Sequence, residues 1–181
     1  IPGDRRLVSG DVVSIDCGAI LDGWHGDGAV TLPVGKVSDE AARLLEACEG
    51  SLWAGIAAMQ VDNRLRDIGA AVEDHVLGAG DYGIVAEDGG HGIGTEMHQD
   101  PHVLNYGTAG RGVKLQKGIC LAIEPMITLG SDDSVELDVY YAASTMVCTP
   151  CSLAQEVGLA LGAQAGERRL SQVVSEGGFS R

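Results

Sequence analysis

Three carboxylates and one histidine occupy positions where an isolated charge would be costly. Asp16 and Asp27 lie in apolar runs, and His91 lies in a glycine-dense segment. Glu124 is the only charged residue in the apolar run 119–127. A carboxylate buried in such a setting is destabilising unless it is paired, protonated or bound to a metal. Oxygen donors with a single imidazole suit divalent ions such as Mn, Fe, Co or Zn.

Asp16 and Asp27 are brought together by the turn between them. The Asp22-Gly23 pair predicts a two-residue hairpin turn, because that turn requires positive φ angles. Asp16 is then opposite Ala29, and Asp27 is opposite Gly18. Opposed side chains share one face of a hairpin, so the two carboxylates are neighbours that repel unless a proton or a cation lies between them. The alternative interpretation is that each acid pairs with Arg or Lys at the surface.

Hydropathy and turn signals predict the elements that position these residues. Ser38 is expected to cap the first helix, and Asn63 the second. In chain order we expect a strand over 12–20 that is buried on both faces, a return strand over 24–32, helices over 38–59 and 63–78, a glycine-rich loop over 89–98, an irregular segment over 100–112, and a strand over 119–127.

Other reactive side chains give weaker signals. His98 could donate a hydrogen bond to a substrate carbonyl, or it could be an ordinary surface histidine. His25 and His75 are expected to be structural or exposed. Cys148 and Cys151 form a single Cys-x-x-Cys pair, without the second pair or the nearby histidine that a zinc site needs. No nucleotide-binding loop is present, because the glycine spacing fails the known patterns.

Composition limits the classes of function. The chain has 181 residues, enough for one domain with a core. A formal net charge of −14 argues against DNA or RNA as a partner. No apolar run is long enough to span a membrane, and the first residues do not resemble a signal peptide. Five scattered cysteines are not expected to form a disulfide framework, which favours a reducing cytoplasm.

Three motifs together resemble the type I methionine aminopeptidases, of the bacterial branch of the M24 metallopeptidases. They are Ser-Ile-Asp16-Cys-Gly with Asp-Gly-Trp-His-Gly-Asp27, then Gly-Gly-His91-Gly-Ile-Gly-Thr-Glu-Met-His98, then Ala-Ile-Glu124-Pro-Met. The resemblance covers about residues 1–138. It implies the α/β pita-bread fold, a curved antiparallel sheet with flanking helices.

The resemblance also implies an activity: removal of the N-terminal methionine from proteins and peptides, with metal-bound hydroxide as the nucleophile. Two divalent ions (Co, Mn, Fe or Zn) would be the cofactors. Asp16 would bind one ion, Asp27 would bridge both, and His91 would bind the other. Glu124 would be a further ligand that serves in proton transfer, and His98 would position the substrate carbonyl. Polypeptides with N-terminal Met, including nascent chains at the ribosome, would be the substrates, in the cytoplasm.

The chain departs from the family pattern at both ends. It begins after the family's N-terminal segment, and residues 139–181 lack the Glu-His-Thr motif that supplies a fifth ligand. Glu156 lies near the expected distance but lacks that motif. We therefore expect a pita-bread domain over 1–138 and a divergent tail over 139–181, and our hypothesis for the tail is a shifted reading frame or an altered terminus. The alternatives are an inactive pita-bread protein that binds a partner and a proline-type aminopeptidase. The oligomeric state is left open.

Overall fold

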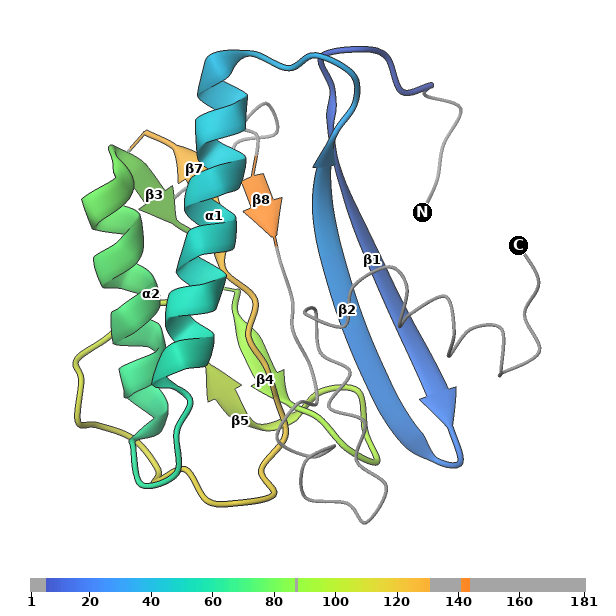
Figure 1. Cartoon of the computed structure of the whole chain (residues 1–181). Coiled ribbons are helices and arrows are strands. Elements are labelled where there is room, and N and C mark those ends of the chain that lie inside the picture. The colour runs from blue at the N-terminus through green and yellow to red at the C-terminus, as the bar shows by residue number, and fades with distance from the viewer. Residues whose placement is uncertain (1–5, 87, 131–140, 144–181) are drawn as a thin grey trace.

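The computed structural model describes residues 6–86, 88–130 and 141–143. Two long helices lie side by side, a long hairpin lies to one side of them, and most of the short strands lie behind the helices (Figure 1). The elements are β1 Val12–Leu21, β2 Trp24–Pro33, α1 Asp39–Ala58, α2 Leu65–Ala79, β3 Tyr82–Ile84, β4 Gly90–Gly92, β5 Gln99–Val103, β6 Leu121–Ala122, β7 Met126–Leu129 and β8 Tyr141–Ala143.

The strands form three small sheets in the described part of the chain. The hairpin β1-β2 is one, and the others have the orders β3-β7-β8 and β5-β4-β6, all with antiparallel neighbours. This confirms an α/β fold with antiparallel strands and flanking helices. Among the described residues the strands form three separate sheets, whereas the sequence predicted one curved sheet.

The hairpin has the predicted register. Asp16 is opposite Ala29, and Asp27 is opposite Gly18. The turn residues Asp22-Gly23 have φ angles of 51° and 83°, as their residue types predict. The two carboxylates therefore belong to the same face of the hairpin.

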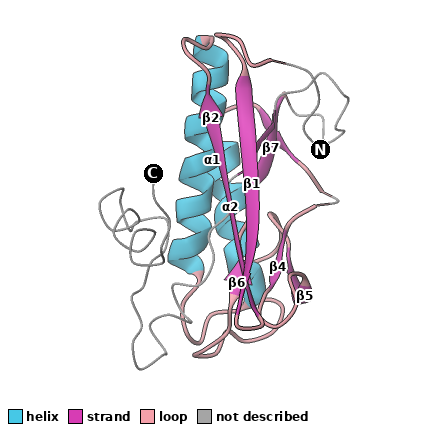
Figure 2. Cartoon of the chain, turned by 90° about the vertical axis from the view of Figure 1, so that its right-hand side faces the viewer, coloured by secondary structure: helices cyan, strands magenta, loops and turns pink. Residues whose placement is uncertain are grey.

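The prediction that β1 is buried on both faces is wrong. The face turned away from Asp16 carries only apolar residues and glycine, and no described element lies over it in Figure 2. Its large side chains are exposed: Ile15 by 49%, Leu21 by 76%, Trp24 by 61%, Val30 by 45% and Leu32 by 43%. Hydropathy correctly marks an apolar face, but it does not say whether another element covers that face.

The helices confirm one predicted cap and correct the other. Ser38 caps α1, with its Oγ accepting a hydrogen bond from the Ala41 N–H at 3.1 Å. The N-cap of α2 is Arg64, whose N–H donates to the Asp67 carboxylate at 2.6 Å. Asn63 instead donates its side-chain N–H to a backbone carbonyl at the end of α1. The Asp67 carboxylate in the first turn thus determines where α2 begins.

The core forms where the two helices pack against each other and against the short strands. Their apolar faces have the predicted spacing, and the buried side chains fall into two clusters. The first contains Leu44, Ala47, Cys48, Val72, Val76 and Ile127, and the second contains Leu52, Ile68, Val103, Leu115, Leu121 and Ile123. This packed layer is the rigid support behind the strands that carry His91 and Glu124.

Two segments expected to be irregular contain strands, and one expected strand is broken. β4 lies inside the predicted loop 89–98, and β5 overlaps the start of the predicted irregular segment 100–112. The apolar run 119–127 is divided into β6 and β7, with Glu124 between them. Short strands rich in glycine and proline lack the periodicity on which the prediction relied.

Two general expectations can be compared with the described residues. None of the described helices has the length and apolar character needed to cross a membrane. Cys17 and Cys48 are not disulfide-bonded, whereas Cys120 is. Apart from β8, the tail 139–181 and its Glu156 lie outside the described residues.

Candidate metal centre

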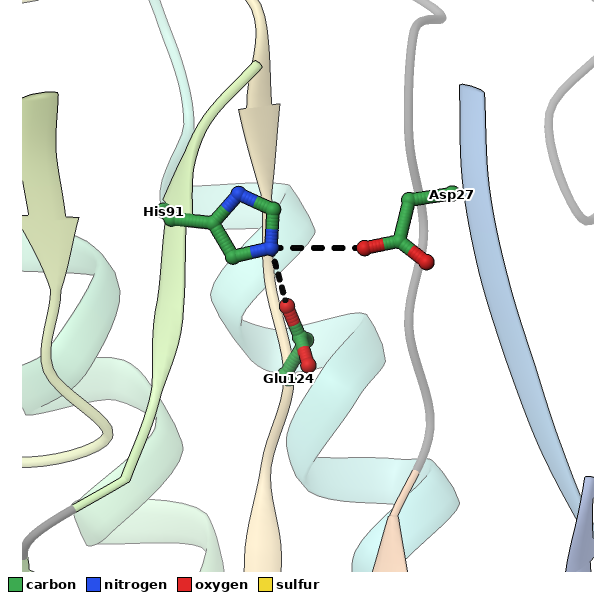
Figure 3. Close-up of side chains that lie close together, drawn as sticks. All are labelled: Asp27, His91 and Glu124. Atoms are coloured by element: carbon green, nitrogen blue, oxygen red, sulfur yellow. Dashed lines mark ion pairs between the residues drawn. The ribbon is translucent and has the colours of Figure 1, made fainter. Parts of the chain in front are cut away.

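Asp27, His91 and Glu124 converge from three separate segments of the chain. Asp27 comes from the hairpin, His91 from β4 and Glu124 from the backbone between β6 and β7 (Figure 3). The His91 Nε2 atom lies 2.9 Å from Glu124 Oε1 and 3.3 Å from Asp27 Oδ2. All three side chains are at least 86% buried. One ligand atom from each lies within 4.8 Å of the others, which is a geometry that can hold a metal ion.

The orientation of the His91 ring is fixed by its other nitrogen. Nδ1 lies 3.0 Å from the Gly92 carbonyl oxygen, which can only accept a hydrogen bond. In neutral imidazole the proton is therefore on Nδ1, and the lone pair of Nε2 points at the two carboxylates. Metal-binding histidines are typically held in this way.

Two buried atoms at the centre of this cluster lack hydrogen-bond partners among the residues that the structure describes. Nε2 of His91 and Oε1 of Glu124 are both inaccessible to solvent and unpartnered, although they are only 2.9 Å apart. A lone pair on nitrogen facing a lone pair on oxygen requires a proton or a cation between them. Two carboxylates and one neutral imidazole are also a donor set that divalent metals accept, so the residues present fit the metal that the sequence motifs imply.

The surroundings of Glu124 disfavour its charge when no metal is bound. Its pKa is raised to about 7. Burial is the largest cause, and the negative charges of Asp27 and Asp16 add to it, whereas His91 acts in the opposite direction. A divalent cation would reverse this balance by favouring the carboxylate.

Glycine allows β4 to carry His91 between two closely spaced strands. A Cβ at Gly92 would overlap the Asp100 carbonyl of β5, and a Cβ at Gly90 would overlap the Ala122 carbonyl of β6. Only glycine permits both approaches. The glycine density noted in the sequence is thus explained by strand packing on both sides of His91.

Asn105 was not predicted from the sequence, yet it contributes to the site. It is 1% exposed and donates a hydrogen bond from Nδ2 to the Glu124 backbone carbonyl at 2.7 Å. The segment around it lies close to α2, because a Cβ at Gly69 would lie 2.5 Å from the Leu104 carbonyl. A buried polar residue in an irregular segment carries no local sequence signal, so only the tertiary structure could identify it.

The structure places the other predicted site residues around this cluster but not in it. Asp16 is exposed on β1, on the hairpin face of Asp27, and near enough to affect the pKa of Glu124. His98 is exposed, and its ring packs edge-on against His91 with the centroids 4.5 Å apart. Their roles as ligand and substrate contact therefore remain predictions.

His25 and His75 differ in their surroundings. His75 is exposed, as expected. His25 is half-buried, with its Nδ1 inaccessible and unpartnered within the described residues, and its backbone N–H donates to the Gly94 carbonyl at 2.8 Å. That hydrogen bond attaches the hairpin to the segment that follows His91.

Comparison with known proteins shows the family to which the chain belongs. The model of metallopeptidase family M24 matches residues 1–149, so the chain is a member of this family. It is 53% identical over 144 residues to methionine aminopeptidase 1 of Mycobacterium tuberculosis, and this match covers 77% of the chain and 54% of the relative. It is 47% identical to the methionine aminopeptidase of Clostridium acetobutylicum, with 72% and 52% covered.

A solved structure gives the same result. The crystal structure of methionine aminopeptidase from Thermotoga maritima matches with a TM-score of 0.73 and 35% identity, covering 77% of this chain and 59% of that one. The resemblance to bacterial methionine aminopeptidases and the pita-bread fold are thereby confirmed. The chain spans about half the length of the curated relatives it matches. Family membership together with the donor set indicates divalent metal ions as the cofactors.

Proposed function

We propose that the chain carries the metal centre of a methionine aminopeptidase, which hydrolyses the first peptide bond after an N-terminal methionine. The observation that carries this proposal is the unpartnered His91 Nε2, aimed at the carboxylates of Asp27 and Glu124. The same chain is 53% identical to a methionine aminopeptidase over 144 residues, and the M24 family match over residues 1–149 includes all three residues.

Each residue of the cluster has a distinct role in this proposal. Asp27 and Glu124 supply anionic oxygen ligands, and the hydrogen bond from His91 Nδ1 to Gly92 keeps Nε2 directed at the ion. Asp16 is the proposed additional ligand for a second ion. A bound divalent metal supplies Lewis acidity and lowers the pKa of water.

Proton transfer and substrate placement fall to Glu124 and His98. Glu124 can take up or release a proton at Oε1, which faces the centre of the cluster. His98 is exposed beside His91, where it can donate a hydrogen bond to a substrate carbonyl. The Glu124 side chain is only 14% exposed, so little water reaches the polar centre and each electrostatic interaction there is strengthened.

The test is methionine release by the purified 181-residue chain with Mn²⁺ or Co²⁺ added, using a Met-Ala-Ser tripeptide. An Ala-Pro-Ala peptide serves as the substrate of a proline-type enzyme. Release of methionine that is lost on Asp27→Ala supports the proposal. Turnover of the proline peptide alone, or methionine release that survives Asp27→Ala, contradicts it.

A second candidate is a metal-binding M24 protein without catalytic activity. It is favoured by one observation: among the described residues only Asp27, His91 and Glu124 form the cluster, whereas Asp16 and His98 are exposed and lie outside it. Metal binding in the cluster without hydrolysis of either peptide would select it.

The proposed partners and location follow from the proposed activity. Polypeptides that begin with Met, including chains emerging from the ribosome, would be the substrates, and the cytoplasm would be the compartment. The net charge of −14 argues against a nucleic-acid partner.

A further inference from the structure

A second concave site lies between α2 and β3, apart from the metal cluster. It has a volume of about 330 Å³, within the range of small-molecule sites. Its walls come from Glu73 and Leu77 on α2, from Tyr82 and Ile84 on β3, and from Tyr106. None of the three cluster residues lines it, so metal binding does not account for it.

The negative charge of Glu73 indicates the kind of ligand that suits this pocket. Glu73 is the only ionisable acid or base in the lining apart from the two tyrosine hydroxyls, and within the described residues no cation pairs with its carboxylate. Its Oε2 accepts a hydrogen bond from the Gly107 N–H at 3.0 Å, which leaves Oε1 for another donor. The Arg66 side chain lies near Gly107, since a Cβ at Gly107 would be 3.3 Å from its Nη1, but Arg66 does not line the pocket.

The remaining walls suit a cation attached to an apolar stem. Tyr82 and Tyr106 offer aromatic rings, which attract ammonium and guanidinium groups. Both rings are anchored: Tyr82 packs against the core, and the Tyr106 hydroxyl reaches the Ala86 carbonyl at 3.4 Å. Leu77 and Ile84 add aliphatic surface.

We propose that this pocket, the Glu73 pocket, binds a guanidinium or alkylammonium group on a short apolar stem. Its volume equals the share of roughly eleven water molecules at ~30 Å³ each, room for a group of about ten non-hydrogen atoms. Such a group occurs on free amines and on the side chains of arginine and lysine in a polypeptide. The binding of these cations does not depend on the activity of the metal centre.

The test uses n-butylguanidinium and the neutral n-butylurea, which match in size and differ in charge. We expect n-butylguanidinium to bind the full chain with a millimolar Kd, with amide NMR shifts confined to α2, β3 and the residues next to Tyr106. We expect n-butylurea to bind at least about fivefold more weakly. An acetylated, amidated arginine and a tripeptide with arginine at its centre distinguish a free ligand from a side chain of a polypeptide.

Glu73→Gln is the decisive variant, because glutamine can still accept the Gly107 hydrogen bond while losing the charge. Asp74→Asn is its control, since it removes one charge from the adjacent exposed position of the same helix. A loss of at least about fivefold in Glu73→Gln only, with unchanged circular dichroism, supports the proposal. No shift up to 50 mM ligand, equal binding of n-butylurea, or the same loss in both variants overturns it.

Discussion

The pKa of Glu124 predicts how the stability of the metal-free chain depends on pH. This pKa is raised from 4.5 to about 7, mainly by burial. The unfolded chain therefore releases the Glu124 proton near the lower value, and the folded chain near the higher one. Between the two, the folded state binds more protons, so the free energy of unfolding must fall as pH rises through this window.

The size of this effect can be estimated. Each unit of pKa difference corresponds to about 1.4 kcal/mol, so the limit is about 3 kcal/mol. Because some water still reaches the Glu124 carboxylate, whose side chain is 14% exposed, we expect a loss of about 1–2 kcal/mol from this group. Glu124→Gln has no proton to release and should lack this part of the pH dependence.

The assay is urea denaturation of the EDTA-treated chain at several pH values between roughly 5 and 8, followed by tryptophan fluorescence and far-UV circular dichroism. Glu46→Gln, on the surface of α1, is the matched control and should retain the wild-type slope. A Glu124→Gln chain with the same slope as the wild type would refute the reasoning. A second result would also refute it: a wild-type free energy of unfolding that does not change with pH across this window, together with a different pH slope for Glu46→Gln.

Three further predictions concern metal binding and folding. Asp27→Asn should weaken Mn²⁺ binding more than about tenfold by calorimetry, whereas Asp22→Asn in the turn should not. An equal loss of Mn²⁺ affinity in both variants would contradict the assignment of Asp27 to the metal-binding cluster. Gly92→Ala should lower the free energy of unfolding by roughly 2 kcal/mol or more, because the added Cβ overlaps β5. Gly28→Ala is the control, since its Cβ enters open space. Similar losses of unfolding free energy in the two variants would contradict the close approach of β4 and β5. Asp67→Ala should lower the Tm at neutral pH and lower it less toward pH 3. The reason is that two backbone N–H groups hold the pKa of Asp67 below 3.8. A Tm difference between variant and wild type that does not change with pH would contradict this.

Local sequence signals were sufficient for the hairpin and the first helix. The Asp22-Gly23 turn sets the register that brings Asp27 onto the inner face, and both facts can be read from residue types and alternation. Ser38 likewise marks the start of α1. Such features depend on interactions between near neighbours, which a sequence encodes directly.

The rest of the site depends on contacts between distant segments. β4 and β5 have no recognisable periodicity, because glycine in these strands serves the approach of their neighbours. The role of Asn105 depends on a hydrogen bond to a residue nineteen positions later. The motifs located Glu124 and His91, but only the structure shows that their facing atoms lack partners.

The open apolar face of the hairpin illustrates a different limit. The nearly continuous apolar run of β1 predicted burial on both faces, yet Leu21 and the Trp24 opposite it are largely exposed in the part of the chain that the structure describes. Hydropathy reports the tendency of a face to be covered, and it does not identify an element that covers it.

The most direct test of the central claim is the number of divalent ions held by the cluster. The full chain is equilibrated with Mn²⁺ or Co²⁺, separated from free metal by gel filtration and analysed by inductively coupled plasma spectrometry. The account predicts at least one ion for each chain, lost on His91→Ala and retained on the exposed-surface variant His75→Ala. A chain that holds no ion, or that holds as much metal after His91→Ala as before, would contradict the account.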